Sequence, residues 1–269
     1  MIPHFKAILL FLLVLFVLLP FGLIRTGERS DPYHVDVAKR YQPPSVAHPF
    51  GTDDLGRNML ARTLLATGLS LSVVGRSLLV AFTLAVILGG IAGLYKGRLP
   101  DHAISYLIAL LHTVPFILIA VALAAVLQAS LNSIYLIIGC IAWAAPARLV
   151  RAEVMRLRDA RFVQAQRAFG LSPTAIFCKS ILPLTILPPF IGLLYLTPEL
   201  VGIDVGLSFF GLGAQPPTPT VGRLIYDGIN YFRSAWWLTV MPSAVLIMFI
   251  LVLYGILDVV KARRRFLTL

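Results

Sequence analysis

Charged residues are scarce in this sequence. Only 13% of its 269 residues are Asp, Glu, Lys or Arg, whereas 58% are hydrophobic, and the mean hydropathy is +0.87. Soluble domains carry about 25% charged residues. This composition therefore argues against an ordinary soluble protein and indicates that the lipid bilayer is the solvent of the chain.

Cysteines and catalytic motifs are also scarce. The two cysteines, Cys140 and Cys178, fall in a hydrophobic run and in a polar segment, so we expect neither a disulfide nor a cysteine metal site. The sequence contains no GxxxxGK[ST], HExxH, CxxC or GxSxG motif. Because these motifs supply phosphate binding, metal binding or a nucleophile, we expect a protein that is not an enzyme, with no cofactor or metal bound by this chain.

Long runs without charge are abundant. Four of them approach the ~20 residues that a membrane helix needs, namely residues 7–24, 77–95, 180–198 and 235–257. A fifth stretch between Asp101 and Arg148 has no charge and is long enough for two helices, with a turn at Gln128–Ser133. The sequence therefore predicts six membrane spans.

The positive charges indicate the orientation of these spans. With a cytoplasmic N-terminus, the dense basic clusters at residues 148–167 and 261–265 both fall on the cytoplasmic side, as the positive-inside rule requires. Because the charges flank spans and form no single basic face, we expect no nucleic-acid binding despite a net charge of +11. The first span lacks an Ala-x-Ala cleavage site and is expected to be a retained anchor.

The spans divide the chain into an anchor with an external segment (1–70), a membrane domain (71–260) and a basic tail (261–269). The external segment is proline-rich at first. It then becomes helical, with Thr52 or Asp53 as the predicted cap and apolar residues at helical spacing. Two interpretations of this helix remain open, a surface helix lying on the membrane and a helix that docks a partner.

A few polar residues and breaks interrupt the spans. His112 is expected to be a neutral imidazole bonded to a neighbouring helix, and Pro115 is expected to kink the third span. Glu199 and Asp204 come near the outer end of the fifth span. Because a charge in hydrocarbon costs at least about 2.5–3.5 kcal/mol, these two residues are candidates for lining a wet pathway.

The segment SFFGLGAQPPTPTVG (208–222) cannot form a regular helix. Its glycines, Gly211 and Gly213 among them, and its prolines predict an external loop at the mouth of a pathway, since irregular backbone at membrane depth needs protein or water around it. A plain surface connection anchored by Trp236 and Trp237 is the alternative.

The segment FVQAQRAFGLSPTAIFCKSILP (162–183) is polar and basic within an apolar chain. Helical spacing from Arg148 to Phe169 predicts one helix, with Val154, Leu157, Arg161, Ala165 and Ala168 near one face. Gly170 is expected to end this helix in a left-handed conformation. Ser172 is expected to cap a second helix and Pro173 to begin it. Such a helix–turn–helix on the cytoplasmic side suits docking into a groove of a partner.

The sequence resembles a permease subunit of the ABC importers for peptides and nickel, the second of the two permeases in such systems. Four stretches carry the resemblance, which runs from Phe50 to Asp258: HPFGTDDLGRNMLARTLL, FVQAQRAFGLSPTAIFCKSILP, GLSFFGLGAQPPTPTVG and WWLTVMPSAVLIMFILVLYGILD.

The resemblance implies an all-α membrane protein with six transmembrane helices, the type I importer permease fold and a cytoplasmic coupling loop. It implies a multi-pass protein of the bacterial cytoplasmic membrane with both termini in the cytoplasm. The implied partners are a second permease, two ATPase subunits that use ATP and Mg, and an extracytoplasmic solute-binding protein.

The second stretch corresponds to the loop that engages the ATPase in this family. Ala165, Gly170, Leu182 and Pro183 match its pattern, whereas Gln164 stands in place of the usual Glu. The cargo stays open among peptides, nickel or metal chelates and related small solutes. Two other classes of protein also stay open. One is an ion-coupled secondary transporter, which only His112 and Pro115 support. The other is a structural or regulatory membrane subunit.

Overall fold

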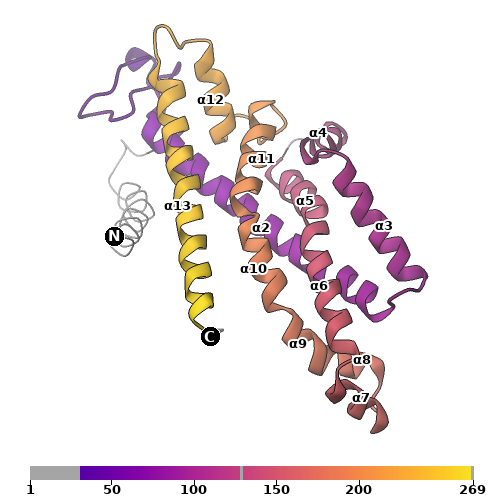
Figure 1. Ribbon diagram of the computed structural model, residues 1–269. Coiled ribbons are helices and arrows are strands. Elements are labelled where there is room, and N and C mark those ends of the chain that lie inside the picture. The colour runs from indigo at the N-terminus through magenta and orange to yellow at the C-terminus, as the bar shows by residue number, and fades with distance from the viewer. Residues whose placement is uncertain (1–30, 128–129, 268–269) are drawn as a thin grey trace. The chain divides into compact units, whose positions relative to one another are not determined.

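The computed structural model describes residues 31–127 and 130–267, and this part of the chain is helical, as predicted (Figure 1). Within the described ranges the only β-pairing is an isolated bridge between Thr52 and Asn58. The helices, of which η2 is a 3₁₀ turn and η3 a π-helical turn, are η2 (Val37–Lys39), α2 (Met59–Leu94), α3 (Leu99–Thr113), α4 (Phe116–Val126), α5 (Leu131–Ala142), α6 (Ala144–Arg158), α7 (Arg161–Ala168), α8 (Pro173–Ile176), η3 (Phe177–Ile181), α9 (Leu182–Thr185), α10 (Leu187–Tyr195), α11 (Thr197–Phe209), α12 (Val221–Ile229) and α13 (Trp237–Leu267).

The described chain forms two compact units. Unit 1 contains the residues up to Val73, a short piece around residue 130 and the chain from Pro198 onward; unit 2 contains Val74–Gln128 and Asn132–Thr197. Helix α2 contributes its first part to unit 1 and its second part to unit 2. The three-part division of the sequence stays a prediction, and its first boundary, at residue 70, falls inside α2.

Helix α2 begins later than expected and is longer. The side-chain oxygen of Asn58 accepts hydrogen bonds from the backbone N–H groups of Leu60 (2.9 Å) and Ala61 (3.4 Å), so Asn58 is the cap. The predicted cap Asp53 instead closes the preceding loop by accepting from the backbone of Leu55 and Arg57. The cap predicted at Thr52 or Asp53 is therefore wrong, and the residues from Met59 onward form the first turns of a continuous 36-residue helix.

The span count agrees with the sequence over the described residues. Two helices, Met59–Leu94 and Trp237–Asp258, are long and apolar enough to cross a membrane alone, and three bent helix pairs bring the total to up to five. The sixth predicted span, residues 7–24, lies outside the described residues. Pro115 does more than kink the third span, since α3 and α4 meet there at 95°. Proline disrupts helical hydrogen bonding and fits at a helix start, which explains the break.

Glycines allow α2 and α6 to approach closely within unit 2. A Cβ atom on Gly89 would lie 2.5 Å from the carbonyl oxygen of Ala147, and one on Gly93 would lie 2.7 Å from Cβ of Val154. Small residues permit this close helix packing, which is common between membrane helices.

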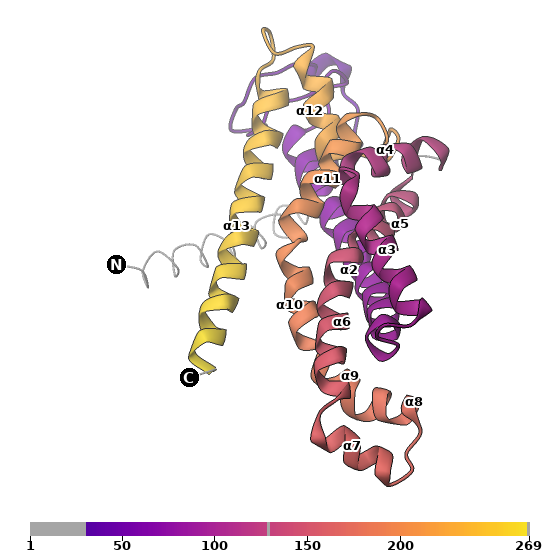
Figure 2. The ribbon, with the colours of Figure 1, turned by 45° about the vertical axis from the view of Figure 1, so that its right-hand side comes forward.

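Unit 1 contains a hairpin of α12 and α13, which run side by side in both views (Figures 1 and 2). Helix α12 was not predicted. The loop before α2 is fastened to the start of α13, because the indole N–H of Trp237 donates to the carbonyl oxygen of Thr52 (3.3 Å). A Cβ atom on Gly51 would also meet the Trp237 ring at 2.7 Å, and Trp237 is buried. Trp237 therefore anchors the segment before α2, whereas its neighbour Trp236 is exposed.

Candidate functional site

The polar segment that follows α6 folds as a short helical hairpin, α7–α8 (residues 159–176), which Figure 2 shows at the end of α6. The single helix predicted from Arg148 to Phe169 is wrong, because α6 ends at Arg158 and α7 starts at Arg161. The break changes the buried face. Of the residues predicted to share one face, Val154 and Leu157 are buried, whereas Arg161, Ala165 and Ala168 are exposed. The buried residue of α7 is Val163.

Gly170 forms the turn of this hairpin in the predicted left-handed conformation, with φ of +80°. Its N–H donates to the carbonyl oxygen of Arg167 (2.9 Å), and the N–H of Leu171 donates to that of Gln166 (3.2 Å). This pair of bonds is the Schellman arrangement, which satisfies the last carbonyl groups of a helix. The sequence prediction for Gly170 is therefore confirmed.

The second arm starts as the sequence indicates. Helix α8 begins at Pro173, and the hydroxyl oxygen of Ser172 accepts from the N–H of Ala175 (3.3 Å). A π-helical turn follows, and then α9, which contains Leu182 and Pro183. Leu182 is half-buried and Pro183 is exposed. The predicted coupling residues thus occupy one continuous path from α7 to α9.

The hairpin has a buried base and an exposed apolar tip. The base is a cluster in which Val154, Leu157, Val163, Ile176 and Ile181 are buried together, with Leu94 packed against it. The exposed apolar side chains of the hairpin are Phe169 and Leu171, which flank Gly170 at the turn, and Phe162 in the first turn of α7. Phe169 is 83% exposed. A fixed base with an apolar tip is the arrangement expected of a docking element.

Gln164 and Ala165 lie on the exposed side of α7. The amide nitrogen of Gln164 donates to the backbone carbonyl of Asp159 (3.0 Å), which closes the gap between α6 and α7. The side chain of Ala165 is a single methyl group, so it does not block the approach of a partner to this face of α7.

The residues predicted to line a pathway are divided between the two units. Asp204, on α11, is 3% exposed and its carboxylate is hydrogen-bonded to Ser70, whereas Glu199 on the same helix is exposed. Gly211 has φ of +77°, and a Cβ atom on Gly213 would collide with the side chain and backbone of Ser208.

The loop that carries these two glycines therefore packs on α11. This contact agrees with the need of irregular backbone at membrane depth for surrounding protein or water. Pro115 belongs to unit 2, whereas Asp204, Glu199, Gly211 and Gly213 belong to unit 1. His112 bonds the carbonyl oxygen of Ile108 in its own helix (2.8 Å), so the expected bond to a neighbouring helix is wrong.

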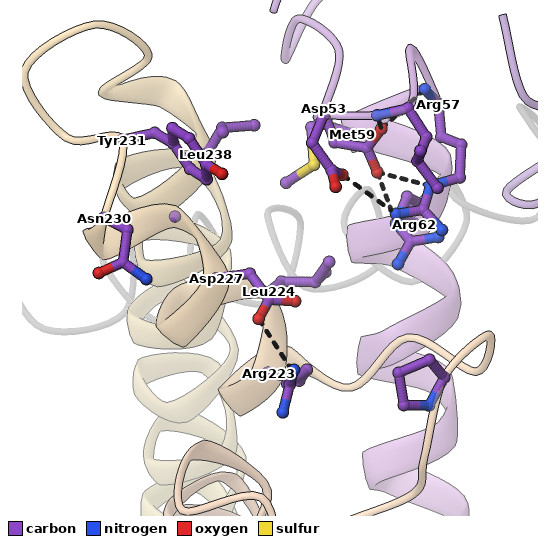
Figure 3. Close-up of a pocket in the computed structure, with 14 residues that line it drawn as sticks. Asp53, Arg57, Met59, Arg62, Arg223, Leu224, Asp227, Asn230, Tyr231 and Leu238 are labelled. Atoms are coloured by element: carbon purple, nitrogen blue, oxygen red, sulfur yellow. Dashed lines mark hydrogen bonds and ion pairs between the residues drawn. The ribbon is translucent and has the colours of Figure 1, made fainter. Parts of the chain in front are cut away.

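A polar cavity of about 380 Å³ in unit 1 was not anticipated (Figure 3). One wall, formed by the loop before α2 and its first turns, carries Asp53, Arg57 and Arg62; the other, formed by α12, carries Arg223 and Asp227. Asp53 pairs with Arg57 (2.7 Å) and Arg62 (3.4 Å), and Arg223 pairs with Asp227 (2.9 Å).

Burial raises the pKa of Asp227, and the positive charge of Arg223 acts against this shift. The GTDDLGR stretch was noticed in the sequence for its capping potential and as part of a stretch that carries the family resemblance, but not as the wall of a cavity. Its partners on α12 come from about 170 residues later in the chain, so no local pattern indicated the cavity.

Comparison with known proteins then identifies the family. The model of the family described as binding-protein-dependent transport system inner membrane component matches residues 85–266. The chain belongs to this family. It is a membrane permease subunit of an ABC importer, and the other two classes left open by the sequence have no support from these comparisons.

Individual relatives agree with this assignment. The permease is 32% identical over 237 residues to the dipeptide transport system permease protein DppC of Bacillus subtilis. This alignment covers 88% of this chain and 72% of that protein. It is 34% identical over 202 residues to the nickel transport system permease protein NikC of Escherichia coli K12. This second alignment covers 75% of this chain and 72% of that protein.

The fold also has a counterpart among solved structures. A chain of the MetNI methionine ABC transporter in an inward facing conformation matches with a TM-score of 0.58 and 18% identity, over 76% of this chain and 95% of that one. At this identity the likeness shows the fold alone, and that fold is the predicted importer permease fold.

Proposed function

We propose that the α7–α8 hairpin is the element through which the permease engages separate ATPase subunits. The observation that carries this proposal is the exposed apolar tip on a polar hairpin whose base is buried. An aromatic side chain left 83% exposed in water gains free energy when a partner covers it, at roughly 25 cal/mol per Å² of apolar surface buried. The rigid Gly170 turn fixes the direction in which this side chain points.

In this proposal the permease supplies the pathway and its partners supply the energy. It pairs with a second permease, two ATPase subunits hydrolyse ATP with Mg, and an extracytoplasmic binding protein delivers the cargo. Relatives named for dipeptide and nickel transport support a small peptide or a nickel species as cargo. ATP binding moves the docked hairpins, and the helix bundles alternate between two access states.

The proposed orientation follows from the basic residues of α6 and α7 and from those of the tail, which are placed in the cytoplasm with both termini. Single cysteines at Ser45 and Gln215, which are both exposed, should react with an impermeant thiol reagent in intact cells. A cysteine at the exposed Ala165 should react only after the membrane is opened. Labelling at Ala165 in intact cells would contradict both the orientation and the docking proposal.

The docking proposal itself is tested by Phe169→Ala. Recovery of the cognate ATPase subunits with the tagged permease should fall about tenfold, the size of effect expected when a central aromatic contact is removed. Val46→Ala is the matched control, because it also removes exposed apolar surface but lies in the external segment. Equal ATPase recovery from both variants would show that the tip contributes nothing to docking.

A further inference from the structure

An ion pair joins α3 to α6 in unit 2, between a buried carboxylate and a guanidinium side chain that is 31% exposed. Asp101 lies in the first turn of α3 and is 3% exposed. Arg151 of α6 binds it with two hydrogen bonds, from Nε to Oδ1 (2.6 Å) and from Nη2 to Oδ2 (3.0 Å). A two-bond contact between a guanidinium group and a carboxylate fixes direction as well as distance, so this pair holds the two helices in one orientation.

The same carboxylate holds the turn between α2 and α3, which we call the corner (Tyr95–Arg98). Its Oδ2 accepts from the N–H of Gly97 (2.8 Å), and its Oδ1 lies 3.3 Å from the hydroxyl of Ser105. Asp101 therefore ties together the corner, the start of α3 and α6. A residue that served only as a local helix cap would need no partner 50 residues away.

A second arginine of α6 bonds the end of α2, next to the corner. Nη1 of Arg158, about two turns after Arg151, donates to the carbonyl oxygens of Leu94 (2.8 Å) and Gly93 (3.4 Å) at the end of α2. Cations are favourable at a helix C-terminus, where these carbonyl groups lack helical partners. Helix α6 is therefore bonded on both sides of the corner, to the start of α3 through Arg151 and to the end of α2 through Arg158.

The contact continues from α6 into the α7–α8 hairpin. Val154 and Leu157 of α6 share one buried cluster with Val163 of α7 and Ile176 of α8, and Leu94 beside the corner packs against it. An unbroken set of packed and hydrogen-bonded groups therefore leads from the hairpin to the corner. These contacts couple the hairpin to the corner only if the two move together when nucleotide binds to the ATPases, and this movement can be measured.

We propose that Asp101 and Arg151 are positioning residues that make the corner move with the α7–α8 hairpin, so that the motion imposed by the ATPases reaches α2 and α3. This inference rests on the proposed docking of the hairpin. Without the pair, α6 would still carry the hairpin and Arg158 would still bond the end of α2. The start of α3 and the Gly97 turn would lose their link to α6, so the corner would lag behind the hairpin.

The test measures the separation of the corner and the hairpin by pulsed electron paramagnetic resonance. Spin labels are placed at Lys96 and Arg167, which are exposed, with Cys140 and Cys178 replaced by Ser. The sample is the assembly with the second permease and the ATPases, without nucleotide and with ATP, Mg and vanadate. In the unmodified background the distance should be the same in both conditions.

The variants Asp101→Asn and Arg151→Gln should each break this constancy. The distance should shift on nucleotide addition by about 1–2 Å or more, the usual scale of helix displacement in switching transitions, and its distribution should broaden. Arg151→Gln leaves a buried carboxylate unpaired and could impair folding. The double variant Asp101→Asn with Arg151→Gln removes both charges, and its shift should be no larger than that of the worse single variant if the two residues act as one unit.

The matched control is Glu153→Gln with Arg156→Gln. This pair is on the same helix, but it spans only one turn of α6 and Arg156 is exposed. It should leave the distance constant. Like the double variant, it removes one negative and one positive charge. It therefore separates the effect of losing the link between α3 and α6 from the effect of losing charge on α6.

Two results would overturn the inference. One is a distance that changes with nucleotide in the unmodified background, since the corner would then not follow the hairpin. The other is a constant distance in the double variant. Recovery of the ATPases with the unmodified permease is checked first. If the ATPases are not recovered, the docking proposal fails, and the distance measurement on the Asp101–Arg151 link is not made. Failure of the docking proposal is therefore distinguishable from failure of this inference.

Discussion

Glycines shape two regions of this permease for different physical reasons. At the α2–α6 contact, Gly89 and Gly93 provide space, since a Cβ atom at either position would overlap the facing helix. At the α7–α8 turn, Gly170 provides a conformation: φ is +80°, and a Cβ atom added there would meet nothing within 4 Å beyond its chain neighbours. Any side chain should therefore fail at the first site, whereas the second should reject only side chains that resist positive φ.

The largest effect is expected from Gly89→Ala. The added methyl group would lie 2.5 Å from the backbone oxygen of Ala147 and 2.8 Å from Cβ of Val150, so the helices must separate. Such overpacking costs typically about 1–3 kcal/mol. The melting temperature of the purified permease in detergent should fall.

Gly68→Ala is the matched control on the same helix, because its Cβ atom meets nothing within 4 Å. Replacing glycine by alanine inside a helix is favourable by about 1 kcal/mol. The two substitutions should therefore shift the melting temperature in opposite directions. A rise for both would show that α2 and α6 are not closely packed.

Gly170→Val should affect docking more than stability. Holding a side chain in the left-handed region costs roughly 1–2 kcal/mol, and a β-branched residue suffers most. Because the turn has open space around it, it should relieve this strain by leaving the left-handed conformation. The permease should therefore still insert with little loss of melting temperature, while the redirected hairpin loses ATPase recovery and transport.

Gly170→Asn separates conformation from size, since Asn adopts positive φ more readily than other side chains. It should retain most of the ATPase recovery that Gly170→Val loses. Equal loss in both variants would mean that the partner needs the space beside Gly170, and the contrast with Gly89 would disappear.

The features that the sequence predicted are local ones. The hairpin was predictable because Gly170, Ser172 and Pro173 act within a few residues of themselves. The spans were predictable because their length and lack of charge follow from the bilayer. The break at Asp159–Ala160 was missed, since neither residue is a strong helix breaker and the buried base of the hairpin decides it.

Tertiary partners were not predictable from one sequence. Asp101 and Arg151 are 50 residues apart, and the two walls of the cavity in unit 1 are farther apart still. The length of α2 was missed for a related reason. Its first turns look amphipathic and its middle contains the exposed glycines Gly68 and Gly75, yet the helix continues through both positions.

The smallest effect is expected at Gln164, on the same hairpin as Gly170 but without a conformational demand. Gln164→Ala removes one exposed hydrogen bond to Asp159, which is worth about 0.5 kcal/mol, so ATPase recovery should fall by about twofold or less. Gln164→Glu gives up the same bond, because a carboxylate cannot donate to a carbonyl oxygen. It also places a negative charge near the start of α7, where the helix dipole favours it.

Recovery of the ATPases should therefore be at least as high for Gln164→Glu as for Gln164→Ala, and higher if the ATPase presents a basic surface. Titrating the salt concentration decides between these outcomes, because an attraction between charges weakens as ionic strength rises. A tenfold loss in Gln164→Ala would place this side chain in the docking contact itself. The hairpin would then depend on a specific polar contact as well as on its turn and its apolar tip.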